Sequence, residues 1–295
     1  MTLNPQVPWT DEQWARVNQV VQEEARRARV AAAFLPLLGP LPADADYVPR
    51  DLISYVPNDG SRSERLAIDD RNTIQLPTLQ VKVYLRGAQM ADADMTSALQ
   101  LFRRAANVLA RVEDMMIFRG LPDAGELNAK TFPGLPSIWE ITGSQKSRGL
   151  LATGKDEGPG IPVPHGNGDA IVGVVADGIG RLEGAGHFGP FAVVLDQAYF
   201  AAVQTPNSNS LVLPQDRIIP FLGGGPLLRS SALPERSGVV MALGGAPVEL
   251  VVATDMSISF LQVTTDPMFV FRVYEKVVLR VKEPDAIVAL KPAAK

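Results

Sequence analysis

The chain has 295 residues, of which 46% are hydrophobic and 20% charged, so it can build one or two packed domains and is too apolar for a disordered chain. Its net charge of −4 argues against a nucleic-acid binder, because such proteins need a basic face for the phosphates. The absence of cysteine excludes disulfides, thiolate zinc sites and cysteine nucleophiles, and two histidines, His165 and His187, are too few for a multi-histidine metal site. This composition argues against a metalloenzyme, and we expect a protein without a cofactor.

The apolar runs are short and interrupted by glycine, proline or charge. None approaches the ~18 apolar residues that span a membrane, and the first residues lack the basic and apolar regions of a signal peptide. We expect a cytoplasmic protein that has no membrane partner.

The first predicted element is an amphipathic helix. Thr10 and Gln13 form a capping-box pattern, and the helix should run from there towards Phe34, before Pro36. Its apolar face is built from Trp14, Val17, Val20 and Val21. This face either packs on the core of its own subunit or docks a partner, and the spacing leaves both possibilities open.

A polar segment, residues 50–75, follows a proline-rich connection. Pro57-Asn58-Asp59-Gly60 is a strong turn signal between two short apolar pieces, which predicts a two-stranded excursion with little core of its own. Such a ribbon should be stabilised by a neighbouring molecule, because an isolated hairpin is marginal in water. Residues 78–86 alternate between apolar and polar and predict a strand.

Residues 96–117 carry an apolar stripe at helical spacing and predict a long helix that Asp94 or Thr96 caps. The acidic neighbours Glu113 and Asp114 point about 100° apart on such a helix, so they do not converge on a catalytic site. We expect them to form salt bridges or to pack at the helix end.

Residues 121–164 are rich in glycine and proline and give no clear prediction. A third helix is expected over residues 169–182, then a strand over 191–195 and a polar loop around Asn207. The remainder is strand-rich, with strands predicted over residues 239–243, 248–254, 257–263, 268–281 and 286–290.

Signals of catalysis are weak. The three glycines 223–225 lack the Lys-Ser/Thr of a phosphate loop, and there is no G-x-S-x-G elbow for a hydrolase. Both histidines lie in turn-like, glycine- and proline-flanked settings, where a loop or contact role is favoured over a Ser-His-Asp triad.

Several strings in consistent order resemble one family. They are TDEQW (10–14), VEDMMIFRG (112–120), Gly149-Leu150-Leu151, GHFGPFAVVL (186–195), LVVATDMSIS (250–259) and FRVYEKVVLRVKEPDAIVAL (271–290). They are similar to segments of the encapsulins, the bacterial nanocompartment shell proteins that are also called linocin-type bacteriocins. Residues 121–148 look longer than the corresponding part of the family.

The resemblance implies an α+β protein with the tailed-phage major-capsid-protein fold, which has a peripheral domain with a long spine helix, an axial domain and an extended loop. The expected parts are residues 1–48 (N-terminal helix and start of the peripheral domain), 49–77 (extended loop), 78–152 (peripheral domain with the spine helix), 153–243 (axial domain) and 244–295 (return to the peripheral domain).

The implied function is that of a non-enzymatic subunit of an icosahedral shell. Many copies would enclose a cargo enzyme, a dye-decolorising peroxidase or a ferritin-like protein, that carries a C-terminal targeting peptide. The resemblance suggests a groove for this peptide, formed by Val17, Val20, Val21, Leu250, Val252 and Ile258. Icosahedral axes bring copies of one loop together, so we expect a pore lined by Thr205, Asn207, Ser208, Asn209 and Ser210.

Two alternatives remain from other classes. A phage or prophage major capsid protein would share the fold, but the capped amphipathic N-terminal helix and the lack of a basic inner arm argue against it. A soluble hydrolase or bacteriocin-like enzyme would need a nucleophile for which the sequence offers no motif.

Overall fold

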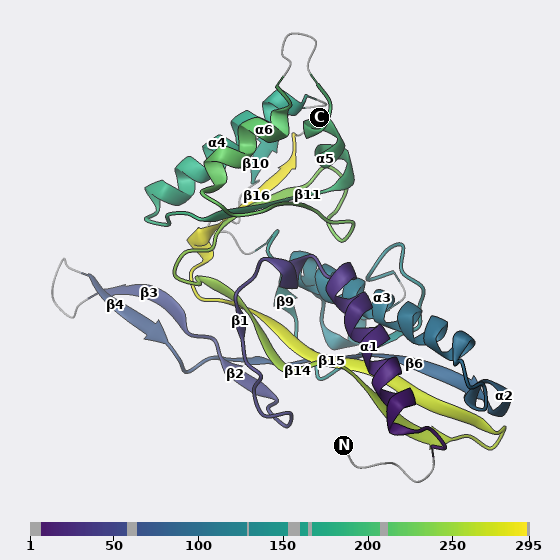
Figure 1. Ribbon diagram of the computed structural model, residues 1–295. Helices are drawn as coiled ribbons and strands as arrows, with labels where there is room; N and C mark the ends of the chain where they lie inside the picture. The colour runs from purple at the N-terminus through teal and green to yellow at the C-terminus, as the bar shows by residue number, and fades with distance from the viewer. Residues whose placement is uncertain are drawn as a thin grey trace.

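The computed structural model describes residues 7–57, 64–128, 130–152, 160–164, 167–206 and 212–293. Two five-stranded sheets organise the chain (Figure 1). Two helices, α1 and α3, lie side by side on the first sheet, a second group of helices covers the other sheet, and a hairpin arm projects away from both (Figure 1). The arrangement is the mixed α/β architecture that the sequence predicts.

The first sheet is built on two long antiparallel strands, β14 (Val248–Val263) and β15 (Met268–Val281). Its order is β1-β14-β15-β6-β8, where β1 is Leu37–Leu38, β6 is Thr78–Arg86 and β8 is Trp139–Thr142. Strand β6 has the predicted bounds, and its alternate residues Leu79, Val81, Val83 and Leu85 are buried. The pattern of period two in the sequence therefore corresponds to one covered face.

Helices α1 (Asp11–Ala28) and α3 (Thr96–Arg119) confirm the two predicted helices. The capping box is present, since the Gln13 amide donates to Thr10 Oγ1 (3.2 Å) and the Thr10 amide donates to Gln13 Oε1 (2.9 Å). The predicted cap of α3 is wrong. Met95 precedes the helix with a φ of 55° and no side-chain cap, and the Thr96 amide donates instead to Asp92 Oδ2 (3.1 Å).

Helix α1 ends at Ala28, earlier than the prediction, and a 3-10 turn (Ala31–Ala33) follows. The reason is a buried carboxylate on α3. Asp114 accepts hydrogen bonds from the backbone amides of Val30 (3.0 Å) and Ala31 (2.8 Å). These amides are thereby withdrawn from the helical pattern, which an alanine-rich sequence would otherwise continue.

Strand β14 is continuous, whereas the sequence predicts two strands separated at residues 255–256. Its pairing with β15 shifts register between Val252 and Thr254 and again between Thr254 and Ser257. These irregularities bend the strand without ending it. They also place Asp255 next to the end of α1, which matters for the site below.

The second sheet has the order β10-β16-β13-β11-β12. These strands are Ile161–Val163, Ile287–Pro292, Gly238–Ala242, Phe191–Leu195 and Leu227–Arg229, and the covering helices are α4 (Gly168–Gly184), α5 (Gln197–Val203) and α6 (Pro214–Ile218). Strand β16 pairs with β10 and β13, so the last strand lies in this sheet.

The arm is the predicted two-stranded excursion. Its outer hairpin pairs β3 (Leu52–Pro57) with β4 (Glu64–Asp69), and its base pairs β2 (Tyr47–Pro49) with β5 (Thr73–Gln75). The predicted turn at residues 58–60 lies outside the described residues.

The described residues of the segment that gave no prediction form short pieces: β7 (Gly120–Leu121), β8, β9 (Ser147–Arg148), β10 and a 3-10 turn (Ala124–Glu126). The remaining short helices are α2 (Gly87–Met90) and two 3-10 turns (Ile219–Leu222 and Pro284–Ala286). The largest hydrophobic cluster joins α1 and α3 to the first sheet and includes Val194 and Met241 of the second sheet, so the two sheets share a core.

Candidate functional site

The structure brings α1 and β14 into contact, as the predicted peptide groove requires. However, Val17 and Val21 are 0% and 1% exposed and belong to the subunit core, and Ile258 is buried as well. These side chains cannot line an open groove in this conformation, because the chain itself already covers them. Val20 is half-buried and packs against the same core.

An apolar depression does lie beside the C-terminal end of α1. This cavity has a volume of about 360 Å³ and includes two members of the predicted set, Leu250 and Val252. Its other lining residues are Arg29, Ala32, Leu37, Leu38, Gly39, Pro40, Glu113, Asp255 and Val277. The sequence analysis missed the contribution of the edge strand β1, since a two-residue strand leaves no periodic signal.

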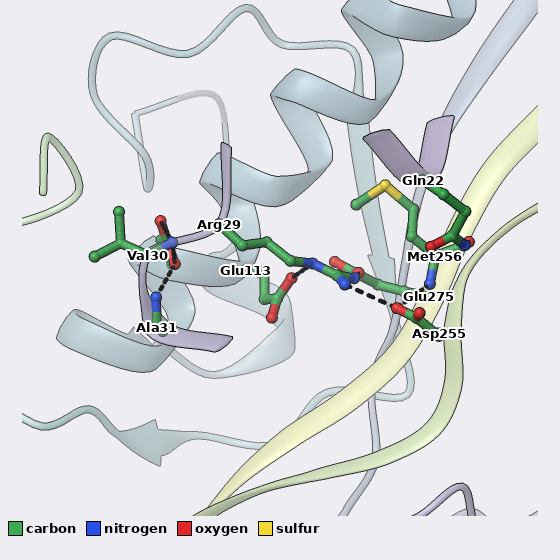
Figure 2. Close-up of polar contacts among 9 residues, drawn as sticks. Gln22, Arg29, Val30, Ala31, Glu113, Asp255, Met256 and Glu275 are labelled. Carbon is green, nitrogen blue, oxygen red and sulfur yellow. Dashed lines mark hydrogen bonds and ion pairs between the residues drawn. The ribbon is translucent and has the colours of Figure 1, made fainter. Parts of the chain in front are cut away.

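One end of this depression is polar. Arg29 lies directly after α1, and its guanidinium contacts three carboxylates from three different elements (Figure 2). Its Nε lies 2.5 Å from Glu113 Oε2 on α3, its Nη1 lies 2.8 Å from Asp255 Oδ1 on β14, and its Nη2 pairs with Glu275 on β15. We call these four residues the Arg29 cluster.

Burial controls the protonation of these groups. The side chains of Glu113 and Glu275 are fully covered, and this burial raises the pKa of both carboxyls, with Arg29 opposing the shift. Burial also raises the pKa of Asp114 to about 8, in spite of the two backbone amides that favour its ionised form. Burial alone would lower the pKa of Arg29, but Glu275 and Glu113 raise it above its ordinary value.

The acidic pair on the long helix therefore has the structural role that the sequence predicts. Glu113 forms a salt bridge, and Asp114 holds the backbone after α1. The partner Arg29 could not be identified from the sequence. The available signal was two acidic residues inside an apolar helix, which call for a partner without naming it.

A second ionic group fixes the base of the arm. Arg280 on β15 lies 2.6 Å from Asp51 Oδ2 through Nη1 and donates from Nε to Glu249 Oε1 (2.5 Å), while Lys282 Nζ lies 3.4 Å from Glu249 Oε2. The Ile53 amide also donates to the Lys282 carbonyl (2.9 Å). We call Arg280, Lys282, Glu249 and Asp51 the Arg280 cluster.

Beyond this base the arm exposes apolar side chains. Tyr55, Leu66 and Ile68 are 67%, 66% and 62% exposed, and Tyr55 stands directly opposite Leu66 in the hairpin. Next to the arm base lies a larger cavity of about 750 Å³, whose lining includes the cationic residues Arg50, Lys146 and Arg148. The arm and its base thus present both apolar and basic surface.

The remaining sequence candidates are not brought together. His187 Nε2 lies 3.2 Å from Asp285 Oδ1, and His165 is outside the described residues. Gly223 and Gly224 form a turn with φ of 58° and 93°, which glycine adopts without strain. Thr205 is exposed after α5, whereas Asn207, Ser208, Asn209 and Ser210 lie outside the described residues.

Within the described part of the chain, no cluster of three or more His, Asp or Glu side chains could hold a metal ion. None of the helices among the described residues has the length and apolarity of a membrane span.

Comparisons with known proteins show which family and which fold the chain resembles. A family model described as "Encapsulating protein for peroxidase" matches residues 2–128 and 138–278. The unmatched residues 129–137 lie inside the segment predicted to be longer than in the family. The chain is 29% identical over 300 residues to a type 1 encapsulin shell protein of Myxococcus xanthus, covering 97% of this chain and 94% of that protein.

Solved structures show the fold. A virus-like particle from Pyrococcus furiosus superposes with a TM-score of 0.64 at 16% identity, covering 95% of this chain and all of that one. The capsid of a Myoviridae phage gives a TM-score of 0.58 at 14% identity, covering 87% and 89%.

Proposed function

Because the chain belongs to the encapsulin shell-protein family, whose model describes an encapsulating protein for peroxidase, we propose that its copies close into an icosahedral compartment around a peroxidase cargo. The chain is a structural shell subunit with the phage-capsid fold, and it is not an enzyme. The single observation that supports closure is the arm, whose apolar side chains Tyr55, Leu66 and Ile68 are largely exposed in the described part of the subunit. A ferritin-like cargo is the second candidate.

The proposed role of the arm is to lie on a neighbouring copy. Its three exposed apolar side chains would each gain roughly 1.5–3 kcal/mol on burial, whereas a free hairpin is marginal in water. The Arg280 cluster fixes the arm base to the sheet, so the arm can be held out without a core of its own. Many copies of one modest contact then sum in a closed symmetric assembly.

The test of assembly removes the apolar face and keeps the hairpin. In the double variant Tyr55→Ser, Leu66→Ser, we expect folded subunits that no longer form shells, seen as a small species by analytical ultracentrifugation with unchanged circular dichroism. The matched control, Tyr55→Phe with Leu66→Met, retains the apolar area and should assemble. Intact shells in the serine variant would contradict the role of the arm.

The cargo is proposed to dock through an apolar C-terminal peptide in the depression at the end of α1. The accessible apolar side chains there are Leu37 on β1, which is 62% exposed, and the half-buried Val252 on β14, with the buried Leu250 and Val277 beneath them. A peptide with two or three apolar anchors could bind there at micromolar strength when it is presented many times over. Val17, Val21 and Ile258 are buried in the subunit core and are not part of this proposed surface.

Leu37→Asp tests the docking site, because an exposed position tolerates a charge without loss of the fold. We expect normal shells that come out empty when co-expressed with a tagged peroxidase cargo, while Leu37→Met loads it. Val20→Asp is a weaker test, because Val20 packs on the core and a charge there also endangers the helix. Equal loading of Leu37→Asp and the parent would refute this docking site.

Two further parts of the proposal rest on the sequence. The loop that contains Thr205, Asn207, Ser208, Asn209 and Ser210 is proposed to line an opening on a symmetry axis, where its neutral side chains would pass small uncharged solutes. The compartment is proposed to be cytoplasmic, and the absence of cysteine fits a reducing environment.

A further inference from the structure

The Arg29 cluster has an excess of acidic groups. The guanidinium of Arg29 faces Glu113 from α3, Asp255 from β14 and Glu275 from β15 (Figure 2). Two other titratable groups pack nearby: Asp114, which accepts from backbone amides, and Glu24 of α1, which accepts from Asn107 Nδ2 (2.8 Å). Among the described residues around this junction, one cation therefore stands against several carboxyls.

The excess negative charge would lie on the two buried carboxyls, Glu113 and Glu275. Asp255 has a side chain that is 57% exposed, so water solvates it, whereas Glu113 and Glu275 have side-chain exposures of 0%. One guanidinium cannot neutralise two fully buried carboxylates, and an uncompensated buried charge costs several kcal/mol. At least one of these two carboxyls should therefore be neutral.

The oxygen atoms show where the neutralising proton would lie. Glu113 Oε1 and Glu275 Oε1 are both buried, and no hydrogen-bond donor reaches either of them within the described structure. Glu113 and Glu275 pair with two nitrogens of one guanidinium, Nε and Nη2 of Arg29, so the two carboxyls meet at the same group. One proton held between them would give both orphan oxygens a partner.

We propose that Glu113 and Glu275 share one proton at neutral pH, and that its loss at alkaline pH weakens the attachment of the end of α1 to α3 and β15. This inference does not depend on the proposed cargo or on shell closure. Arg29 and Glu113 line the 360 Å³ cavity, so the proton can exchange with solvent without unfolding of the subunit.

The direction of the pH effect follows from linkage. A carboxyl in the unfolded chain loses its proton near pH 4, whereas the shared proton is kept in the folded chain to a much higher pH. The folded state thus binds one more proton across neutral pH. The extra bound proton makes its full contribution to stability at pH values below the ordinary pKa of glutamate. The contribution falls as the pH rises, by about tenfold in the unfolding equilibrium constant per pH unit.

The experiment uses the full-length protein in an Asp114→Asn background, which removes the remaining carboxyl with a raised pKa among the described residues. Infrared spectra at pH 7 should show the carbonyl stretch of a protonated carboxyl. The variants Glu113→Gln and Glu275→Gln should each abolish this band and each remove about a tenfold change per pH unit from the unfolding equilibrium constant. Glutamine can donate to the remaining carboxylate and so replaces the shared proton.

The matched control is Glu249→Gln, a buried glutamate on β14 that is paired with Arg280 and Lys282. It should keep both the band and the pH dependence. A band that persists in either glutamine variant at the Arg29 cluster would overturn the sharing of the proton. If the glutamine variants do not fold, the proposal is tested on the Asp114→Asn protein itself. Absence of the carboxyl band from its spectrum at pH 7 would overturn the proposal.

Discussion

Two ionic clusters on the same pair of strands hold two different appendages to the first sheet. The Arg280 cluster fixes the base of the arm, and it sets two cations against two carboxylates, with Glu249 directly opposite Arg280 across the β14–β15 pair. The Arg29 cluster fixes the end of α1, and it sets one cation against three carboxylates. The comparison indicates that a balanced cluster gives a permanent attachment, whereas an unbalanced one gives an attachment that depends on protons.

The largest difference should appear when each arginine is removed. Arg29→Met leaves Glu113 and Glu275 buried without any cation, and breaking such a group typically costs 3–5 kcal/mol. We expect a loss of this size in the free energy of unfolding at pH 8, measured by denaturant titration. Part of the loss should be recovered at pH 5, where the carboxyls bind protons.

An equal loss at pH 5 and pH 8 would show that Arg29 acts by packing alone and not by charge. Arg29→Lys is a suitable control, because it keeps the cation while it loses the planar guanidinium that contacts three elements.

The second prediction concerns Asp114, which belongs to neither cluster but lies beside the first. Its pKa is raised to about 8, so its proton is bound in the folded state and lost in the unfolded state between about pH 4 and pH 8. The protonated form stabilises the fold fully below this window, and the contribution falls by about 1.4 kcal/mol per pH unit within it.

Asp114→Asn should remove this slope, because the amide oxygen still accepts from Val30 and Ala31 but has no proton to lose. The variant should therefore gain stability relative to the parent as the pH rises from 5 to 8, as measured by urea titrations at several pH values. Parallel curves for the two proteins would contradict the raised pKa.

Part of this structure can be predicted from the sequence. Helices α1 and α3, strand β6 and the arm follow from local periodicity and turn residues, and the structure confirms them. The fold class follows from the resemblance of several strings to one family. Periodicity and turn residues are local signals, and the family resemblance is read from strings distributed along the chain. Both can be recognised without knowing the tertiary contacts.

The contacts that form the candidate site are of a different kind. Arg29 and Asp255 are 226 residues apart, and a register shift in β14 brings them together. Likewise, the apolar stripe of α1 does not reveal whether Val17 faces the core or a partner, because both environments favour the same residue types. The structure assigns Val17 and Val21 to the core, and the proposed docking surface is therefore built on β1 and β14.

The smallest effect is expected at the balanced cluster. Arg280→Met leaves Glu249 with Lys282 and leaves Asp51 partly in solvent, so neither carboxylate becomes an isolated buried charge. The loss in the free energy of unfolding should be about 2 kcal/mol, the size of one or two hydrogen bonds to a charged group, and it should be the same at pH 5 and pH 8.

The arm base should bear most of the change in the Arg280→Met variant, because Arg280 also donates to the Pro49 carbonyl (3.2 Å). Hydrogen exchange should therefore accelerate in β2 and β3 while α1 remains protected, and Arg29→Met should give the reverse pattern. Faster exchange in α1 of the Arg280→Met variant would mean that the two clusters are coupled through β14 and β15 and do not hold their appendages independently.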